Sequence, residues 1–160
     1  MPTPEFVLSL REKIGTELLW LTGVTAVVLR GQGDAEEVLL VRRADNGAWT
    51  PVTGIIDPGE EPAAAAAREV LEEADVVAEA ERLVWVQTLP PTEYPNGDRA
   101  QYIDLVFRFR WVSGSPFPAD GENTEAVWCP VASLPAAMSE NMRERIATAS
   151  RNAPEARFHR

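Results

Sequence analysis

The order of apolar and polar residues along the chain predicts short strands interspersed with short helices. An amphipathic helix is expected within residues 1–16, because Leu10 and Ile14 recur at helical spacing before a glycine. Residues 18–30 and 37–43 are rich in leucine and valine, and the turn sequence GQGD separates them. The amino-terminal part therefore predicts one helix followed by two strands.

The clearest helical pattern covers residues 62–74, which begin with proline and contain five consecutive alanines. Further strands are expected at 84–89, at 102–111 and around Val127, and a last helix from Ser139 as N-cap. The strand at 102–111 alternates strictly, which predicts one buried face and a second face that is mostly polar. The buried face would carry Ile103, Leu105, Phe107 and Phe109, and the polar face Asp104, Val106, Arg108 and Arg110.

Strands and helices do not alternate regularly, so a mixed β-sheet flanked by helices, an α-β-α sandwich of the α+β class, fits better than a doubly wound parallel sheet. The length of 160 residues suits one domain over residues 1–160. Residues 152–160 have no clear pattern and are expected to form a mobile tail.

Charge narrows the possible partners. The formal net charge is −10, and such an acidic surface repels a nucleic-acid backbone, so a DNA or RNA polymer is not expected as partner. No stretch approaches the roughly 20 apolar residues of a membrane span, and the amino terminus lacks the pattern of a signal peptide. The single cysteine, Cys129, excludes an internal disulfide. These features together predict a cytoplasmic protein.

Three acidic residues in the predicted helix at 62–74 have a spacing that suggests chemistry. Glu69, Glu72 and Glu73 stand at i, i+3 and i+4, on one side of a helix. Like charges at this spacing destabilise a helix, so the arrangement has no structural benefit of its own. A hard divalent cation reverses the effect, because Mg²⁺, or Mn²⁺ in its place, prefers oxygen ligands. The pattern therefore predicts a metal site.

The stretch GIIDPGEEPAAAAAREVLEEADV at 54–76 resembles the signature of the Nudix hydrolase family, G-x5-E-x7-R-E-U-x-E-E-x-G-U, where U is a bulky apolar residue. The matching residues are Gly54, Glu60, Arg68, Glu69, Val70, Glu72, Glu73 and Val76. Asp75 stands where the family has glycine, and Val52-Thr53 replaces the usual Pro-Gly before the motif. Similarity extends over about residues 23–135.

The resemblance implies Mg²⁺-dependent hydrolysis of a pyrophosphate bond, in which NDP-X and water give NMP and X-phosphate. Glu69, Glu72 and Glu73 would be metal ligands and, with Arg68, the catalytic set. Arg68 would orient these carboxylates, and Gly54 and Glu60 would support the motif. Asp75, at the expected end of the helix, must adopt or avoid the left-handed conformation that glycine takes more easily, with a modest cost in stability and no metal ligand lost.

Residues outside the motif give weaker predictions about substrate binding. Trp49, Arg42 and Tyr94 are candidates for contact with a small nucleotide, and the identity of that nucleotide is left to the loops at 90–100 and 113–122. Later acidic residues could add a ligand or base, although each is better explained as a surface residue. They are Glu122, Glu125 and Glu140.

Two other interpretations stay open at this point. The chain could be a catalytically inactive Nudix-fold module that binds nucleotides or regulates, or an acidic metal-buffering protein without nucleotide chemistry. The amino-terminal helix could cover the sheet or pair with a second subunit, so a homodimer is an expected assembly.

Overall fold

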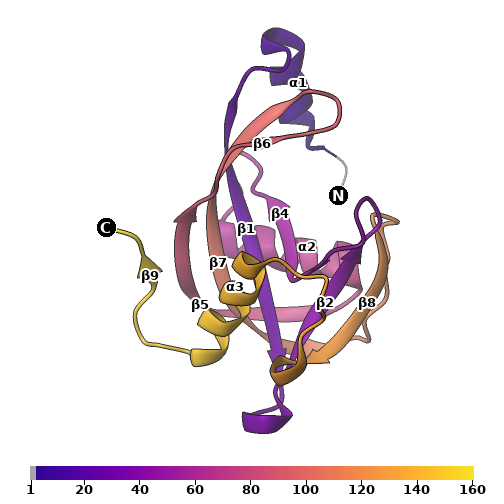
Figure 1. Cartoon of the computed structure of the whole chain (residues 1–160), viewed down its shortest axis with the longest axis vertical. Helices are drawn as coiled ribbons and strands as arrows, with labels where there is room; N and C mark the ends of the chain where they lie inside the picture. The colour runs from indigo at the N-terminus through magenta and orange to yellow at the C-terminus, as the bar shows by residue number, and fades with distance from the viewer. Residues whose placement is uncertain (1–2) are drawn as a thin grey trace.

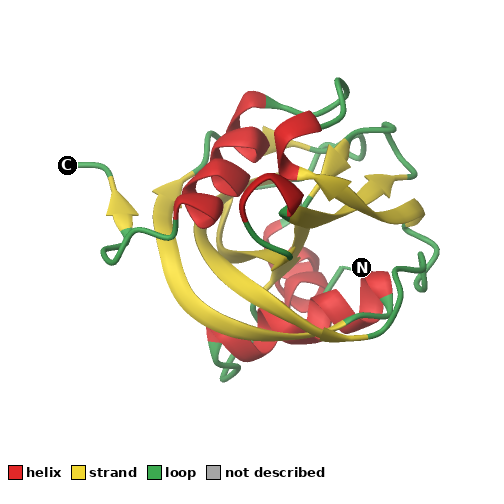
Figure 2. Cartoon of the chain, turned by 90° about the horizontal axis from the view of Figure 1, so that it is seen from below, coloured by secondary structure: helices red, strands yellow, loops and turns green. Residues whose placement is uncertain are grey.

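Runs of aliphatic and β-branched residues form the strands at the centre of the protein. In a computed structural model, which describes residues 3–160, these strands join into one strongly curved sheet (Figures 1 and 2). Its order is β3-β2-β1-β7-β5-β9, while β4 pairs with β1, β6 with β7 and β8 with β2. The strands found among these residues are β1 Leu19–Arg30, β2 Glu37–Arg43, β3 Trp49–Thr50, β4 Val52–Ile55, β5 Val77–Thr88, β6 Thr92–Glu93, β7 Arg99–Ser113, β8 Asn123–Pro130 and β9 Arg157–Phe158.

The sheet is mixed because its central strands β1 and β7 run parallel while most other pairs are antiparallel. Strand β1 pairs with β7 in parallel from Leu19 beside Ala100 to Leu29 beside Arg110. The other edge of β1 is shared: β4 pairs with its middle, and β2 pairs with its last two residues. This division places β4, which carries Gly54, beside the middle of the central strand.

Helices lie on both sides of the sheet, which confirms the expected α-β-α arrangement (Figure 2). Helix α2 (Pro62–Ala74) packs through Val70 against a core that includes Phe109 of β7. Helix α3 (Glu140–Arg151) packs through Ile146 against the opposite face, where Val106 lies. The third helix, α1, spans Glu5–Ile14, and no helix within residues 3–160 is long and apolar enough to cross a membrane.

Helix α1 covers part of the sheet, one of the two roles expected for it. It spans Glu5–Ile14, inside the range expected from the sequence. Val7 is buried against Leu21 and Ala100. Several apolar side chains nearby remain exposed, so the homodimer stays a prediction. They are Leu8, Leu10, Ile14, Leu18 and Trp20.

Strand β7 is buried on both faces over much of its length, including the mostly polar face that carries Asp104. Asp104 and Val106 are 3% and 0% exposed. The reason is that α3, which comes almost 30 positions later in the chain, covers this face. Alternation along one strand could show that Asp104 and Val106 share a face, but not which helix lies over them.

The carboxy-terminal half contains two further differences from expectation. Strand β5 begins at Val77 instead of residue 84, and its early part pairs with β7 despite exposed Glu79. The ion pair between Glu79 and Arg110, with 2.5 Å between oxygen and nitrogen, bridges the two strands. The segment 152–160, expected as a mobile tail, contains β9, which pairs in parallel with β5 and places Arg157 4.0 Å over the Trp85 ring.

Asp75 ends α2 in the left-handed conformation, with φ 54° and ψ 35°, and its N–H donates to the carbonyl of Leu71 at 3.1 Å. Only glycine adopts this conformation without steric strain, although aspartate tolerates it better than most residues. The departure from the family's glycine therefore changes the conformational cost of the helix end and leaves its geometry intact.

We predict that Asp75→Gly raises the free energy of unfolding by about 0.5 kcal/mol, because glycine relieves the left-handed strain. The greater entropy of glycine in the unfolded chain offsets part of this gain. Asp75→Ala should lower stability, because alanine has the strain without aspartate's tolerance. Urea denaturation of the three proteins measures both changes. If alanine were as stable as glycine, the strain argument would be wrong.

Candidate active site

Helix α2 turns two of its glutamates into the protein and leaves the third half-exposed. Glu69 and Glu73 are 0% and 7% exposed, while the side chain of Glu72 keeps 50% of its accessible surface. Alanines at 65 and 66 let the helix pack closely against the sheet, since both are fully buried. The close approach carries the two inner carboxylates into the core.

Gly54 of β4 provides the space in which the Glu69 side chain lies. A Cβ atom at position 54 would stand 2.4 Å from both Cγ and Cδ of Glu69, far inside contact distance. The φ of Gly54 is not in the left-handed region, so glycine is needed there for its small size rather than for its flexibility. The first residue of the motif and its first helical glutamate therefore fit together as one unit.

Arg68 connects three carboxylates with a single guanidinium group. Its Nε and Nη2 donate to the two oxygens of Glu60 at 2.9 and 3.0 Å, a bidentate pair. Its Nη1 donates to Glu69 at 2.9 Å and to Glu72 at 3.2 Å. The arginine holds the pKa of Glu60 below its usual value. Arg68 thus reaches both Glu60 in the turn before α2 and Glu72 on α2 itself.

The two buried glutamates have pKa values above the ordinary value of 4.5 when no cation is bound. Burial raises the pKa of Glu69 to about 7, against the opposing effect of Arg68. Burial also raises the pKa of Glu73 to about 7, although the Asn123 amide donates a hydrogen bond to its Oε2 at 3.1 Å. Glu69 Oε2 is buried without a hydrogen-bond partner. Burying a carboxylate with an unused oxygen is unfavourable unless a positive charge compensates it.

These observations show how well the residues suit a divalent cation. Within residues 3–160, no three histidine, cysteine or acidic side chains stand close enough together to hold a metal ion as they are placed. Glu72 instead contacts Arg68. The donor chemistry nevertheless fits a hard cation, because the site offers carboxylate oxygens only, and one of them is buried and unpartnered.

A cavity of about 580 Å³ opens beside Glu73 and extends along β1 and β7. Asn123 and Thr53 line it near this glutamate, and Tyr94 lines it from the loop after β6. Trp49 and Arg42 are not among the lining residues. Arg42 instead pairs with Glu125 at 2.8 Å.

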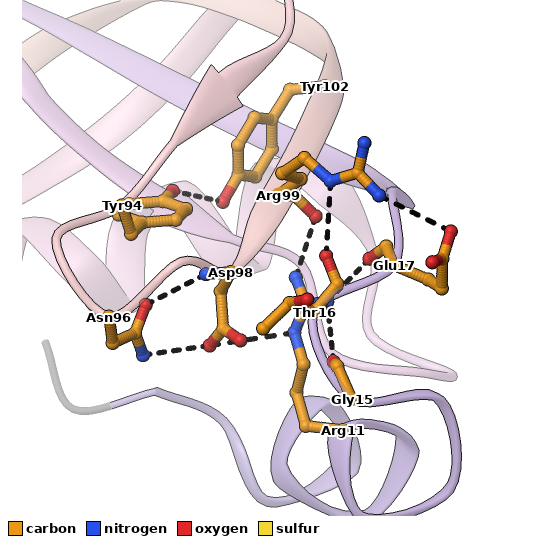
Figure 3. A network of polar contacts seen from close by, with 9 residues as sticks. All are labelled: Arg11, Gly15, Thr16, Glu17, Tyr94, Asn96, Asp98, Arg99 and Tyr102. Atoms are coloured by element: carbon orange, nitrogen blue, oxygen red, sulfur yellow. Dashed lines mark hydrogen bonds and ion pairs between the residues drawn. The ribbon is translucent and has the colours of Figure 1, made fainter.

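The amino-terminal helix and the loop between β6 and β7 form one wall of the cavity, and Arg11 joins them (Figure 3). Arg11 donates to the main-chain carbonyls of Gly15, Glu17 and Arg99 at 3.1, 2.6 and 2.7 Å. Its Nε lies 3.7 Å from the Asp98 carboxylate. The helix therefore takes part in the site as well as in the core.

Comparison with known proteins adds an independent observation. The sequence model of the NUDIX domain matches residues 20–149 of this chain of 160. The chain belongs to the Nudix family. It is accordingly a Nudix hydrolase, and the motif at 54–76 is its Nudix box.

Similar proteins include two relatives in sequence and one solved structure. The MutT-like protein of Streptomyces ambofaciens is 35% identical over 121 residues, 76% of this chain and 68% of that protein. The 8-oxo-dGDP phosphatase of Homo sapiens is 35% identical over 118 residues, 70% of this chain but only 33% of the human protein. The MutT protein from Methanosarcina mazei Go1 superposes with a TM-score of 0.68 at 22% identity, covering 87% and 99% of the two chains, which shows a shared fold.

The sequence offers both Arg42 and Arg43 as residues that could bind phosphate, and Arg43 is the one that lines the Nudix hydrolase cavity. The period of two along β2 contained this signal, because Arg43 shares a face with Val41, another lining residue. The buried pair of Asp104 and Arg145 also lines the cavity, and no local pattern connects these two residues.

The three later acidic residues also differ in whether they line the cavity. Glu122 lines the cavity, whereas Glu125 contacts Arg42 and Glu140 lies exposed in the first turn of α3. The surface interpretation fits Glu125 and Glu140, and Glu122 is the one near the site.

We predict that Gly54→Ala destabilises the Nudix hydrolase by about 1–3 kcal/mol, because the new methyl group displaces the buried Glu69 side chain. Gly23→Ala is the matched control: it lies in β1, has no left-handed φ, and its added Cβ meets nothing closer than 3.4 Å. Denaturant unfolding compares the two. Equal stability of both variants would show that Glu69 does not need the space at Gly54.

The raised pKa values predict how the metal-free protein responds to pH. Because folding raises the pKa of Glu69 and Glu73 above the ordinary 4.5, their favourable contribution is complete below that value and is lost as pH rises through about 7. The melting temperature in a chelator should therefore fall between about pH 5 and about pH 8. Glu69→Gln should make this fall shallower, and an identical slope in both proteins would contradict the assignment.

Proposed function

We propose that this Nudix hydrolase cleaves the pyrophosphate bond of a nucleoside diphosphate derivative with the help of Mg²⁺, for which Mn²⁺ can substitute. Water and NDP-X give NMP and X-phosphate. The observation that supports this most is the buried, unpartnered oxygen of Glu69, next to the cavity-lining Glu73 on one helix. Such a carboxylate pair is unfavourable in a resting protein and useful to one that recruits a cation.

Glu69, Glu72 and Glu73 would hold the metal in this proposal. A bound Mg²⁺ supplies neutralisation of phosphoryl oxygens and a polarised water molecule. The chain has a net charge of −10, and the cation thus removes the repulsion between an acidic enzyme and an anionic substrate.

The remaining residues of the Nudix box position these carboxylates. Arg68 holds Glu69 and Glu72 by hydrogen bonds and is itself fixed by the bidentate contact with Glu60. Gly54 leaves the space for Glu69. A displacement of this frame would move the ligands, and small displacements of catalytic groups reduce rates strongly.

The cavity provides groups that suit a small nucleotide. Arg43 lines it and is held by a bidentate contact with Asp45, so a cation is available beside the proposed phosphate position. Tyr94, whose hydroxyl is 2.7 Å from that of Tyr102, offers an aromatic surface for a base. The human relative acts on 8-oxo-dGDP according to its name, which is a nucleoside diphosphate of the proposed class.

All three helical glutamates of the Nudix box are present, which argues against an inactive binding module. The nucleotide cavity beside them likewise disfavours a protein that only buffers metal ions. Enzymatic turnover is therefore the function that the arrangement supports best.

A panel of nucleoside diphosphates, nucleoside triphosphates, dinucleoside polyphosphates and nucleotide sugars tests the proposal. We expect a nucleoside monophosphate product in millimolar Mg²⁺ and loss of turnover in excess chelator, measured by mass spectrometry of the products. The bond cleaved follows from incorporation of ¹⁸O from labelled water. Metal-independent turnover, or no turnover of any member by folded protein with Mg²⁺, would contradict the proposal.

Glu73→Gln should reduce kcat by at least about 100-fold, because it removes a charged ligand while keeping size and the hydrogen bond from Asn123. Glu125→Gln is the control, since Glu125 is half-exposed on β8 and contacts only Arg42 among the described residues. Circular dichroism and thermal melting should show both variants folded. Full activity in Glu73→Gln would remove this residue from the metal site.

A further inference from the structure

An ion pair with no role in the reaction proposed above is buried in the wall of the cavity. Asp104 of β7 and Arg145 of α3 are each 3% exposed, and Arg145 Nη1 lies 3.4 Å from Asp104 Oδ2. Both residues line the same cavity as Glu73. Charges are rarely buried this deeply without a structural or a recognition role.

The hydrogen bonds of this pair are unevenly shared. The Asp104 carboxylate accepts from Thr25 at 2.9 Å and from Gln87 at 3.1 Å, in addition to its contact with Arg145. Asp104 is therefore well supplied with donors. Its oxygens have no need of a further donor from a ligand.

Arg145, in contrast, has one donor group, Nη2, for which the described residues provide no partner. Its Nη1 donates to Thr25 at 2.7 Å and its Nε to Asn141 at 2.8 Å. For its Nη2, the part of the chain from residue 3 onward provides no hydrogen-bond acceptor. A guanidinium donates only, so Nη2 of Arg145 is a donor for which a bound ligand would supply the acceptor.

Glu73 and Arg145 line the same cavity of about 580 Å³, so one nucleotide bound there can have its pyrophosphate beside Glu73 and its base beside Arg145. We infer that Arg145 determines specificity by donating from Nη2 to a carbonyl oxygen of the base. The substrate class is then nucleotides with an oxo group on that edge, such as 6-oxopurines, in preference to 6-aminopurines. This inference rests on the proposed function for the nucleotide itself.

The physical basis is the mismatch between donors. An amino group at the position of the carbonyl would face a buried cation with its own hydrogen atoms, and both donors would lose a partner. Sites that pair a buried polar group with one substrate atom reject analogues that lack this atom. A single hydrogen bond to a charged donor corresponds to a preference of about tenfold or more.

The wild-type protein alone provides the first test, because inosine and adenosine nucleotides differ at the 6-position of the purine. We expect kcat/KM with Mg²⁺ to be at least about tenfold higher for inosine than for adenosine triphosphate, with a parallel preference for inosine monophosphate in calorimetric binding. Equal values for the two bases, or a preference for adenosine, would overturn the inference.

Variants separate recognition from a purely structural role of the ion pair. Arg145→Lys keeps the positive charge beside Asp104 but has no second nitrogen for the base, so the inosine-to-adenosine ratio should fall close to one. Arg151→Lys, on the same helix outside this cavity, should keep the wild-type ratio. A folded Arg145→Lys protein with an unchanged ratio would show that the pair is only structural.

If Arg145→Lys does not fold, the double variant Asp104→Asn with Arg145→Met removes both buried charges together and takes its place, with the same expected loss of the ratio. Binding of inosine and adenosine monophosphate separates the proposal of base recognition by Arg145 from the proposal of the hydrolase reaction. Base preference in binding without turnover of any nucleotide would refute the hydrolase reaction and support Arg145, whereas turnover without base preference would do the opposite.

Discussion

The contact between Gly54 and Glu69 is the constraint on which the site depends. The Glu69 carboxylate can be buried here only because β4 has no side chain at Gly54, which faces it. It stays there because Arg68 donates a hydrogen bond to one of its oxygens. The spacing of the Nudix box follows from this geometry. Its first residue lies on a strand, its arginine and glutamates lie on the helix that packs against that strand, and Glu60 in the connecting turn fixes the arginine.

In the metal-free protein this arrangement makes the ionised form of the two buried glutamates unfavourable. The buried glutamates are held at a raised pKa because water is excluded and Arg68 compensates only part of the charge. A protein selected for stability alone would replace them with apolar residues or amides. In the proposed function this burial prepares the site for a cation, because carboxylates that are already desolvated attract a positive charge more strongly.

Local sequence patterns predicted the elements that depend on local interactions. The bounds of α2 and β2 and the cap at Ser139 agree with the structure, because propensity, proline position and capping chemistry decide them. Contacts between distant segments were not predictable in this way. The burial of Asp104 depends on α3, the ordering of Arg157 depends on Trp85, and the choice of Arg43 over Arg42 depends on which face of β2 meets the cavity.

The anchor of the amino-terminal helix has a consequence for how such an enzyme diversifies. Arg11 binds three main-chain carbonyls, and every amino acid has a carbonyl. The side chains of Glu17 and Arg99 can therefore change over generations without removing the acceptors of Arg11, whereas Gly15, with φ 59°, is restricted by its backbone conformation. One wall of the binding region can thus acquire new chemistry while the scaffold beneath it keeps its shape, a form of tolerance that suits a fold with many different substrates.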